Sequence, residues 1–133
     1  MSLEPKLEIM RGALATLFPI QWEEPFGLVM IESMLVGTPV IAFAQGAAPE
    51  VVDDGITGFL VRNSAEMAER IRQVGAIDRK RCRQRARERW NSLRMARDYE
   101  HVYAAAVRKQ QRARAHVRSG VDARELAIAA ARR

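Results

Sequence analysis

The sequence predicts an α/β fold, half of a Rossmann-like doubly wound domain, with three parallel strands, covering helices and further C-terminal helices. Three short apolar runs alternate with segments of helical spacing, and strands joined by helical crossovers pair in parallel within one sheet. All five prolines lie at or before Pro49, and only Gly120 occurs after Gly75. Turns are therefore expected in the first part of the chain and long helices in the second.

The first half is expected to hold all three strands. The apolar run from Ala13 to Phe18 stops at Pro19, a pattern typical of a strand buried on both faces. Pro39 opens the second strand, where a missing amide donor is tolerated, and Pro49 suits the first turn of a short helix. In order, the expected elements are a helix at 4–12, a strand at 13–18, a helix at 27–36, a strand at 39–43, a helical turn at 49–52 and a strand at 59–61.

The second half is expected to be helical. Asn63 is suited to cap a helix that begins at the next residue. The expected helices lie at 64–74, at 78–90, from 92 to about 118, and at 122–133. An apolar stripe at helical spacing is expected to be core; its members are Met95, Tyr99, Val102, Tyr103 and Ala106. We therefore expect a first domain at residues 1–107 and a basic helical extension at 108–133.

Composition excludes several classes of protein. The single cysteine, Cys82, excludes an internal disulfide framework and a multi-cysteine zinc site. Neighbouring arginines could lower its pKa and raise its reactivity, although a lone cysteine on a basic helix more often has no role. The longest apolar run is far shorter than the ~20 residues of a membrane helix, and no charged-then-apolar leader is present. The expected location is cytoplasmic, with peripheral binding to the inner membrane face left open.

The most informative stretch holds two glutamates, Glu24 and Glu32, around a helix start. Glu24 is expected in the loop after the carboxyl end of the first strand, which is where open α/β sheets bind ligands. Gly27 and Leu28 would present backbone amides at the helix N-terminus, where donors and the helix dipole together favour a phosphate. Glu32 lies five residues into the helix, roughly 7.5 Å along its axis at ~1.5 Å per residue.

Two interpretations of Glu32 follow. A carboxylate on an otherwise apolar helix needs a partner, because burying it unpaired costs several kcal/mol. Sugar hydroxyls could be that partner, because each can donate a hydrogen bond to a carboxylate oxygen. This interpretation predicts a hexose at Glu24, a phosphate at the amides and a ribose at Glu32. Spacing alone favours the plainer alternative, in which Glu32 is a rim residue in a salt bridge.

An ordered set of short motifs extends along much of the chain. The pieces are Phe18-Pro19, Glu24 to Leu28 with Glu32, Gly37 to Ala42, Gly46, Pro49 to Val52, Asp54 to Val61, and a closing segment from Trp90 to Tyr103. Together they resemble the second half of the C-terminal nucleotide-sugar domain of family-four (group 1) glycosyltransferases, which have the GT-B architecture. The resemblance covers about residues 5–107.

The resemblance implies a retaining glycosyltransferase that moves a sugar from a nucleotide-sugar donor to an acceptor. It implies that Glu24 contacts hydroxyls of the donor hexose, which makes Glu24 the candidate catalytic residue. Phe26, Gly27 and Leu28 would offer backbone groups to the sugar and diphosphate, and Glu32 would hold the ribose hydroxyls.

The family's reaction is commonly described as a same-face displacement assisted by the leaving phosphate. That scheme requires no protein nucleophile, so Glu24 is not assigned as one. A metal-bridging Asp-x-Asp is missing, because Asp53 and Asp54 are adjacent. We therefore expect no metal and no cofactor apart from the donor itself.

The family's complete fold also has an N-terminal acceptor domain and further strands at the start of its C-terminal domain. The twelve residues before Ala13 cannot hold them. We therefore expect a fragment that lacks the Arg/Lys pair clamping the donor diphosphate and that is inactive by itself.

Two rival functions remain open, a non-catalytic associating remnant and a basic binding module. Residues 79–133 carry 17 basic and 5 acidic side chains, which favours an acidic membrane surface or a nucleic acid. Nucleic acid is the less favoured of the two, because no helix-turn-helix, zinc or RNA-binding motif occurs. Association is expected through the strand from Ala13 to Phe18, whose neighbour in the complete strand order 3-2-1-4-5-6 is missing. Pairing with a second copy predicts a two-fold homodimer.

Overall fold

A computed structural model describes residues 3–130, and the side chains of residues 4–115. The chain divides after Asn91 into two compact units. The first unit holds every described strand and helices α1–α5, and the second consists of α6 (Ser92–Ala130). The boundary expected between residues 107 and 108 falls inside this helix.

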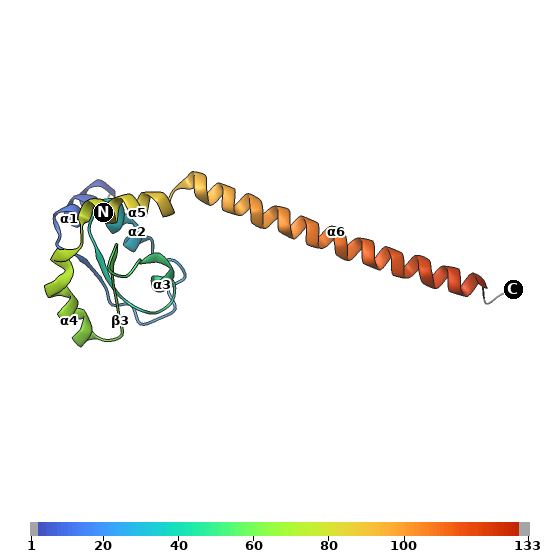
Figure 1. Ribbon diagram of the computed structural model, residues 1–133, viewed down its shortest axis with the longest axis horizontal. Helices are drawn as coiled ribbons and strands as arrows, with labels where there is room; N and C mark the ends of the chain where they lie inside the picture. The colour runs from blue at the N-terminus through green and yellow to red at the C-terminus, as the bar shows by residue number, and fades with distance from the viewer. Residues whose placement is uncertain (1–2, 131–133) are drawn as a thin grey trace. The chain divides into compact units, whose positions relative to one another are not determined.

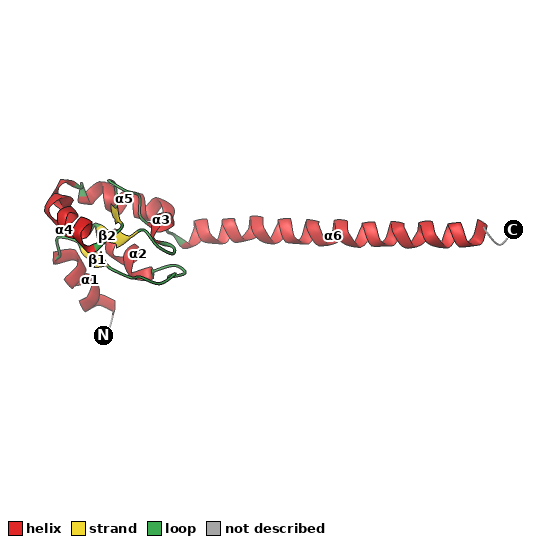
Figure 2. Cartoon of the chain, turned by 90° about the horizontal axis from the view of Figure 1, so that it is seen from below, coloured by secondary structure: helices red, strands yellow, loops and turns green. Residues whose placement is uncertain are grey.

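The first unit is built on a three-stranded parallel sheet with the strand order β1-β2-β3. β1 (Thr16–Phe18) pairs with β2 (Val40–Phe43), which in turn pairs with β3 (Gly58–Val61). Figure 2 shows the strands surrounded by the helices of this unit. The predicted α/β fold with three parallel strands is confirmed.

Side chains cap the N-termini of two helices of this unit, α4 and α5. The Asn63 side chain accepts a hydrogen bond from the Glu66 amide at 2.9 Å, and Asp78 caps α5 in the same way. α2 packs against β1, β2, α1 and α5, while α4 contacts β2 and β3. The bounds are α1 Leu3–Gly12, α2 Leu28–Leu35, α3 Ala48–Val51, α4 Ser64–Gln73, a 3-10 turn Val74–Ala76 and α5 Arg79–Arg89.

The core surrounds β2, whose four residues are all buried, and includes side chains of α2, α4 and α5. Met30, Met34 and Ile41 have no exposed surface. At the β2–β3 contact the backbones approach so closely that a Cβ on Gly58 would lie 1.9 Å from the Val40 carbonyl oxygen. Glycine is therefore the residue that allows these two strands to pair.

One arginine joins the C-terminal end of α1 to the start of α5. The Arg79 guanidinium donates to the carbonyl oxygens of Ala13 at 2.7 Å and Arg11 at 2.8 Å, and to the Thr38 hydroxyl at 2.6 Å. Thr38 is buried and donates in turn to the Met10 carbonyl oxygen. The last carbonyl groups of α1, which a helix end leaves without partners, are thereby satisfied.

The expectation that the first strand is buried on both faces is wrong. β1 is three residues long and lies at an edge of the sheet. Phe18 is buried, and the Thr16 hydroxyl lies 2.8 Å from the Ser33 hydroxyl of α2. Leu17 points to the other face and is 47% exposed, and Leu14 is also exposed. α2 packs on the side of β1 to which Thr16 points.

The second unit also differs from expectation. α6 is one continuous helix that includes Gly120, where two helices were expected, and Figure 1 draws it without a break. The stripe expected to be core is exposed: Met95, Tyr99, Val102 and Tyr103 each expose more than half of their surface. Because this unit consists of a single helix, it has no second element of its own on which the stripe could pack.

Candidate functional site

The loop between β1 and α2 holds the first predicted site residue, Glu24. One carboxylate oxygen accepts a hydrogen bond from the Gly27 amide at 3.2 Å, and the other accepts one from the Trp22 indole at 3.3 Å. Glu24 is partly buried, whereas Trp22 is 62% exposed. The carboxylate thus stands at the carboxyl end of β1, at the N-terminus of α2, with both oxygens oriented by its own loop.

A second loop, which follows β2, lies directly against Glu24. The Ala47 amide donates to the Glu24 carbonyl oxygen at 2.9 Å. Gly46 has a φ of 53°, and a Cβ there would lie 2.6 Å from the Glu24 nitrogen. This close approach requires glycine, so Gly46 fixes where the two loops meet.

Gly27 starts α2 from a left-handed backbone conformation. Its φ is 72°, and a Cβ would come within 2.4 Å of the Met30 side chain. Gly27 is buried, whereas Phe26 and Leu28 on either side are exposed. The Phe26 ring lies edge-on to the Trp90 ring, with 5.6 Å between the ring centroids. The start of α2 therefore has a buried glycine with an exposed apolar side chain on either side of it.

Glu32 lies further along α2 and forms an ion pair. Lys6 of α1 places its Nζ 2.8 Å from Oε1 and 2.8 Å from Oε2 of Glu32. The partner that this carboxylate needs is thus supplied by the chain itself. Both side chains keep part of their surface in solvent, 33% for Lys6 and 26% for Glu32.

The structure brings Glu24, Gly27 and Leu28 together at one helix start and places Glu32 on the same helix. Sequence reasoning missed Lys6 as the partner of Glu32 and Ala47 as the amide on Glu24. No local pattern could have revealed Lys6, which is 26 residues away from Glu32. The glycine at position 46 was the only signal for the second loop.

Other candidate groups have structural roles. Asp53 is paired with Arg85 at 2.6 Å and with Arg89, both on α5. Among the described residues no group of three His, Cys, Asp or Glu side chains could hold a metal ion. Cys82 is fully buried, and burial raises the pKa of its thiol to about 11, with Arg79 lowering it in part. A reactive Cys82 thiolate is therefore excluded.

Sequence comparison identifies the family. Residues 2–89 match the family of group 1 glycosyl transferases. The chain belongs to the group 1 glycosyltransferases. It is 37% identical over 114 residues to a D-inositol 3-phosphate glycosyltransferase of Nocardioides sp., covering 82% of this chain and 24% of that protein. It is also 36% identical over 93 residues to an uncharacterized 41.2 kDa protein in the cps region of Klebsiella pneumoniae, covering 65% and 26%.

Solved structures with a similar fold include complexes of one protein with UDP and with UDP-glucose. Anabaena Alr3699/HepE in complex with UDP is similar with a TM-score of 0.65 and 27% identity, over 74% of this chain and 29% of that protein. Its complex with UDP-glucose gives a TM-score of 0.64. The chain spans about a quarter of the length of these relatives. Across the described residues, no helix is long and apolar enough to cross a membrane.

Proposed function

We propose that this chain forms part of the nucleotide-sugar site of a retaining glycosyltransferase. The observation that carries the proposal is the loop in which Glu24 bonds the Gly27 amide while its own carbonyl accepts from Ala47. This loop lies at the carboxyl end of a parallel strand and at a helix N-terminus, which suits a sugar diphosphate. The UDP and UDP-glucose complexes of Anabaena HepE support a ligand of that class.

Each site residue has a proposed contact. Glu24 accepts hydrogen bonds from hydroxyls of the donor hexose. The backbone at Phe26, Gly27 and Leu28 faces the sugar and diphosphate, and glycine at position 27 permits the left-handed conformation from which α2 starts. Glu32 binds the ribose hydroxyls, which then compete with Lys6 for the carboxylate.

In the reaction, an acceptor hydroxyl oxygen bonds to C1 of the hexose on the face from which the bond to the diphosphate breaks. The hydroxyl proton passes to the leaving phosphate oxygen, so atoms balance without a protein nucleophile or a metal. Glu24 orients the hexose for this displacement, and orientation can account for a large share of rate acceleration. The acceptor and the donor base are not assigned.

Titration of the 133-residue chain with UDP-glucose, followed by amide NMR shifts, tests the proposal. We expect saturable shifts at Gly27 and Leu28 with a millimolar Kd, about −4 kcal/mol. Glu24→Gln and Glu32→Gln should each weaken binding, and Glu8→Gln, an exposed change on α1, should not. No saturable shift at Gly27, or equal weakening by all three variants, would overturn the proposal. We expect this chain not to turn over UDP-glucose, because it spans about a quarter of the length of its relatives.

Homodimerisation through β1 is a second proposal about partners. β1 is an edge strand; Leu17 within it is 47% exposed, and Leu14, two residues before it, is 59% exposed. An uncovered edge with apolar side chains tends to pair with another strand. Antiparallel pairing with a second copy would give a closed two-fold dimer with six strands. Sedimentation should then give about twice 15.0 kDa, whereas a monomer at tens of micromolar would refute the dimer.

Peripheral binding to an acidic membrane surface is proposed for α6. Tyr99, Val102 and Tyr103 are exposed on a helix that also carries exposed arginines such as Arg97 and Arg108. Aromatic and aliphatic side chains beside basic ones suit a headgroup layer. Binding to phosphatidylserine vesicles should weaken as the screening length falls from ~10 Å at 0.1 M salt to ~3 Å at 1 M. Equal binding to neutral vesicles would refute it.

A further inference from the structure

A pocket of about 500 Å³ lies at the carboxyl ends of β2 and β3, and none of the site residues assigned above lines it. Its walls come from the loop after β1, the end of β2 and the turn into α4. The lining residues are Gln21, Phe43, Ala44, Gln45, Val61, Arg62, Asn63 and Ser64. The volume lies within the range of sites that hold small ligands, and the position at strand ends is where α/β sheets bind them.

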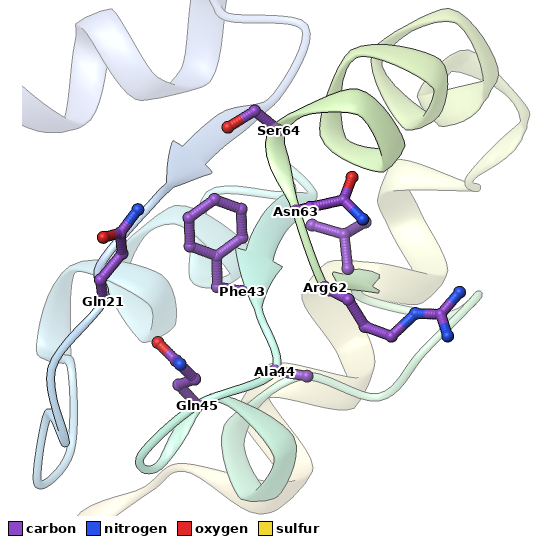
Figure 3. A pocket seen from close by; sticks show the side chains of 8 residues that line it. Gln21, Phe43, Ala44, Gln45, Arg62, Asn63 and Ser64 are labelled. Atoms are coloured by element: carbon purple, nitrogen blue, oxygen red, sulfur yellow. The ribbon is translucent and has the colours of Figure 1, made fainter.

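The pocket floor is apolar and its rim is formed by side-chain amides. Phe43 and Val61 are 8% and 1% exposed. Figure 3 shows Gln21 and Gln45 on one side of the Phe43 ring and Asn63 on the other. Among the described residues, no side chain or backbone group forms a hydrogen bond with the side-chain amides of Gln21 or Gln45. The Asn63 side-chain oxygen caps α4, which leaves its NH2 group available.

The charged residue of the rim is already neutralised. Arg62 donates from Nε to Glu66 at 2.9 Å, and its terminal nitrogen lies 2.6 Å from the same carboxylate oxygen. The Arg62 amide donates to the other oxygen at 2.9 Å. These hydrogen bonds lower the pKa of Glu66 and raise that of Arg62. Figure 3 shows the guanidinium extending away from Phe43, so among the described residues that line the pocket none offers a free cation to an anion.

We propose that this pocket binds a neutral, hydroxyl-rich ligand, one sugar unit of a saccharide. Each glutamine amide offers both a donor and an acceptor, which is what vicinal hydroxyls require. The part of Phe43 that remains exposed gives the floor an apolar patch against which C–H groups of a sugar can lie. Neither Glu24 nor Glu32 lines the pocket, and we assign its ligand as distinct from the donor nucleotide proposed above.

The test uses the full chain and two probes, methyl α-glucoside as the neutral sugar and inorganic phosphate as the anion. We expect the sugar to shift the Gln45 and Asn63 amide resonances saturably, with a millimolar Kd, about −4 kcal/mol. The double change Gln21→Ala with Gln45→Ala should weaken this binding at least about fivefold, or 1 kcal/mol. Gln84→Ala, an exposed amide on α5 that bonds Glu88, is the matched control and should leave it unchanged.

Four results would overturn the proposal: no saturable shift with the sugar, phosphate binding in the pocket more tightly than the sugar, unchanged binding in the double variant, or displacement of the sugar by UDP. Repeating the sugar titration with saturating UDP separates the two sites. Unchanged sugar affinity supports a distinct pocket, whereas displacement by UDP would overturn it. If UDP does not bind at all, the donor proposal fails while the sugar result still stands, so the two failures are distinguishable.

Discussion

Lys6 Nζ lies 2.8 Å from both carboxylate oxygens of Glu32. The pair links α1 to the middle of α2, and it occupies the one carboxylate of α2 that could accept ribose hydroxyls. Because both side chains are partly exposed, the pair is one that a ligand can displace. Its net contribution to stability is expected to be less than about 1 kcal/mol.

Lys6→Met should therefore change ligand binding more than it changes stability. Removing the ammonium leaves Glu32 free for the ribose, so we expect UDP to bind about three- to tenfold more tightly, up to 1.4 kcal/mol. Isothermal titration measures the affinity, and thermal unfolding should shift by only a few degrees. Lys80→Met, which removes an exposed charge from the start of α5, serves as the control. Weaker UDP binding in Lys6→Met would show that Lys6 assists the ligand instead of competing with it.

Gly58→Ala should disrupt the sheet. The added methyl group would lie 1.9 Å from the Val40 carbonyl oxygen, which belongs to backbone and cannot turn aside. We expect a loss of about 3 kcal/mol or more in the free energy of unfolding, measured by urea denaturation. Gly75→Ala, where nothing lies within 4 Å, should have little effect. Equal stability of the two variants would contradict the close approach of β2 and β3.

Arg79→Met should release the C-terminal end of α1. The guanidinium donates hydrogen bonds to two carbonyl groups and to the Thr38 hydroxyl. We therefore expect the substitution to lower the free energy of unfolding by about 2–3 kcal/mol. Arg79→Lys should recover only part of this, because an ammonium cannot reproduce the planar fork. Hydrogen exchange of α1 amides should become faster in Arg79→Met, and Arg81→Met, which changes an exposed residue, is the control. Unchanged hydrogen exchange in α1 would show that Arg79 does not hold the end of this helix.

The buried thiol of Cys82 predicts a loss of stability at alkaline pH. Its pKa is about 11 in the folded chain and 9.0 when unperturbed. As pH rises, the thiol of the unfolded chain therefore loses its proton before that of the folded chain. The contribution of Cys82 to the free energy of unfolding is complete below pH 9 and is lost as pH rises toward 11. Cys82→Ala should remove that share of the pH dependence. Urea unfolding of both proteins at about pH 8 and about pH 10 measures it; identical slopes would contradict the buried thiol.

Local chemistry in the sequence was sufficient to predict several elements. Asn63 caps α4 as its residue type indicates, and a turn follows α2 at Gly37, whose φ is 85°. Alternating apolar runs predicted three parallel strands. These features depend on residues close together in the chain, where capping and backbone preferences act.

Features that depend on distant residues could not be predicted. Arg79 donates hydrogen bonds to carbonyl groups 66 and 68 residues away in the sequence. Lys6 and Glu32 are 26 residues apart. Burial of β1 was overestimated because an apolar run does not say whether a helix covers each face. Gly120 did not end α6, since a single glycine costs about 1 kcal/mol in a helix and neighbouring alanines and arginines favour helix. Roles of the site residues remain predictions.

The bonds around Glu24 have a thermodynamic consequence for any ligand of the loop. Its carbonyl is held by Ala47 and its carboxylate by Gly27 and Trp22, so the conformational entropy of the loop is lost when the chain folds. A ligand arriving there has little left to order, and less of its binding energy is consumed by immobilising side chains. The order of the loop and the affinity for the ligand are thus linked. A substitution that loosens the loop, such as Gly46→Ala, would weaken ligand binding without a contact to the ligand.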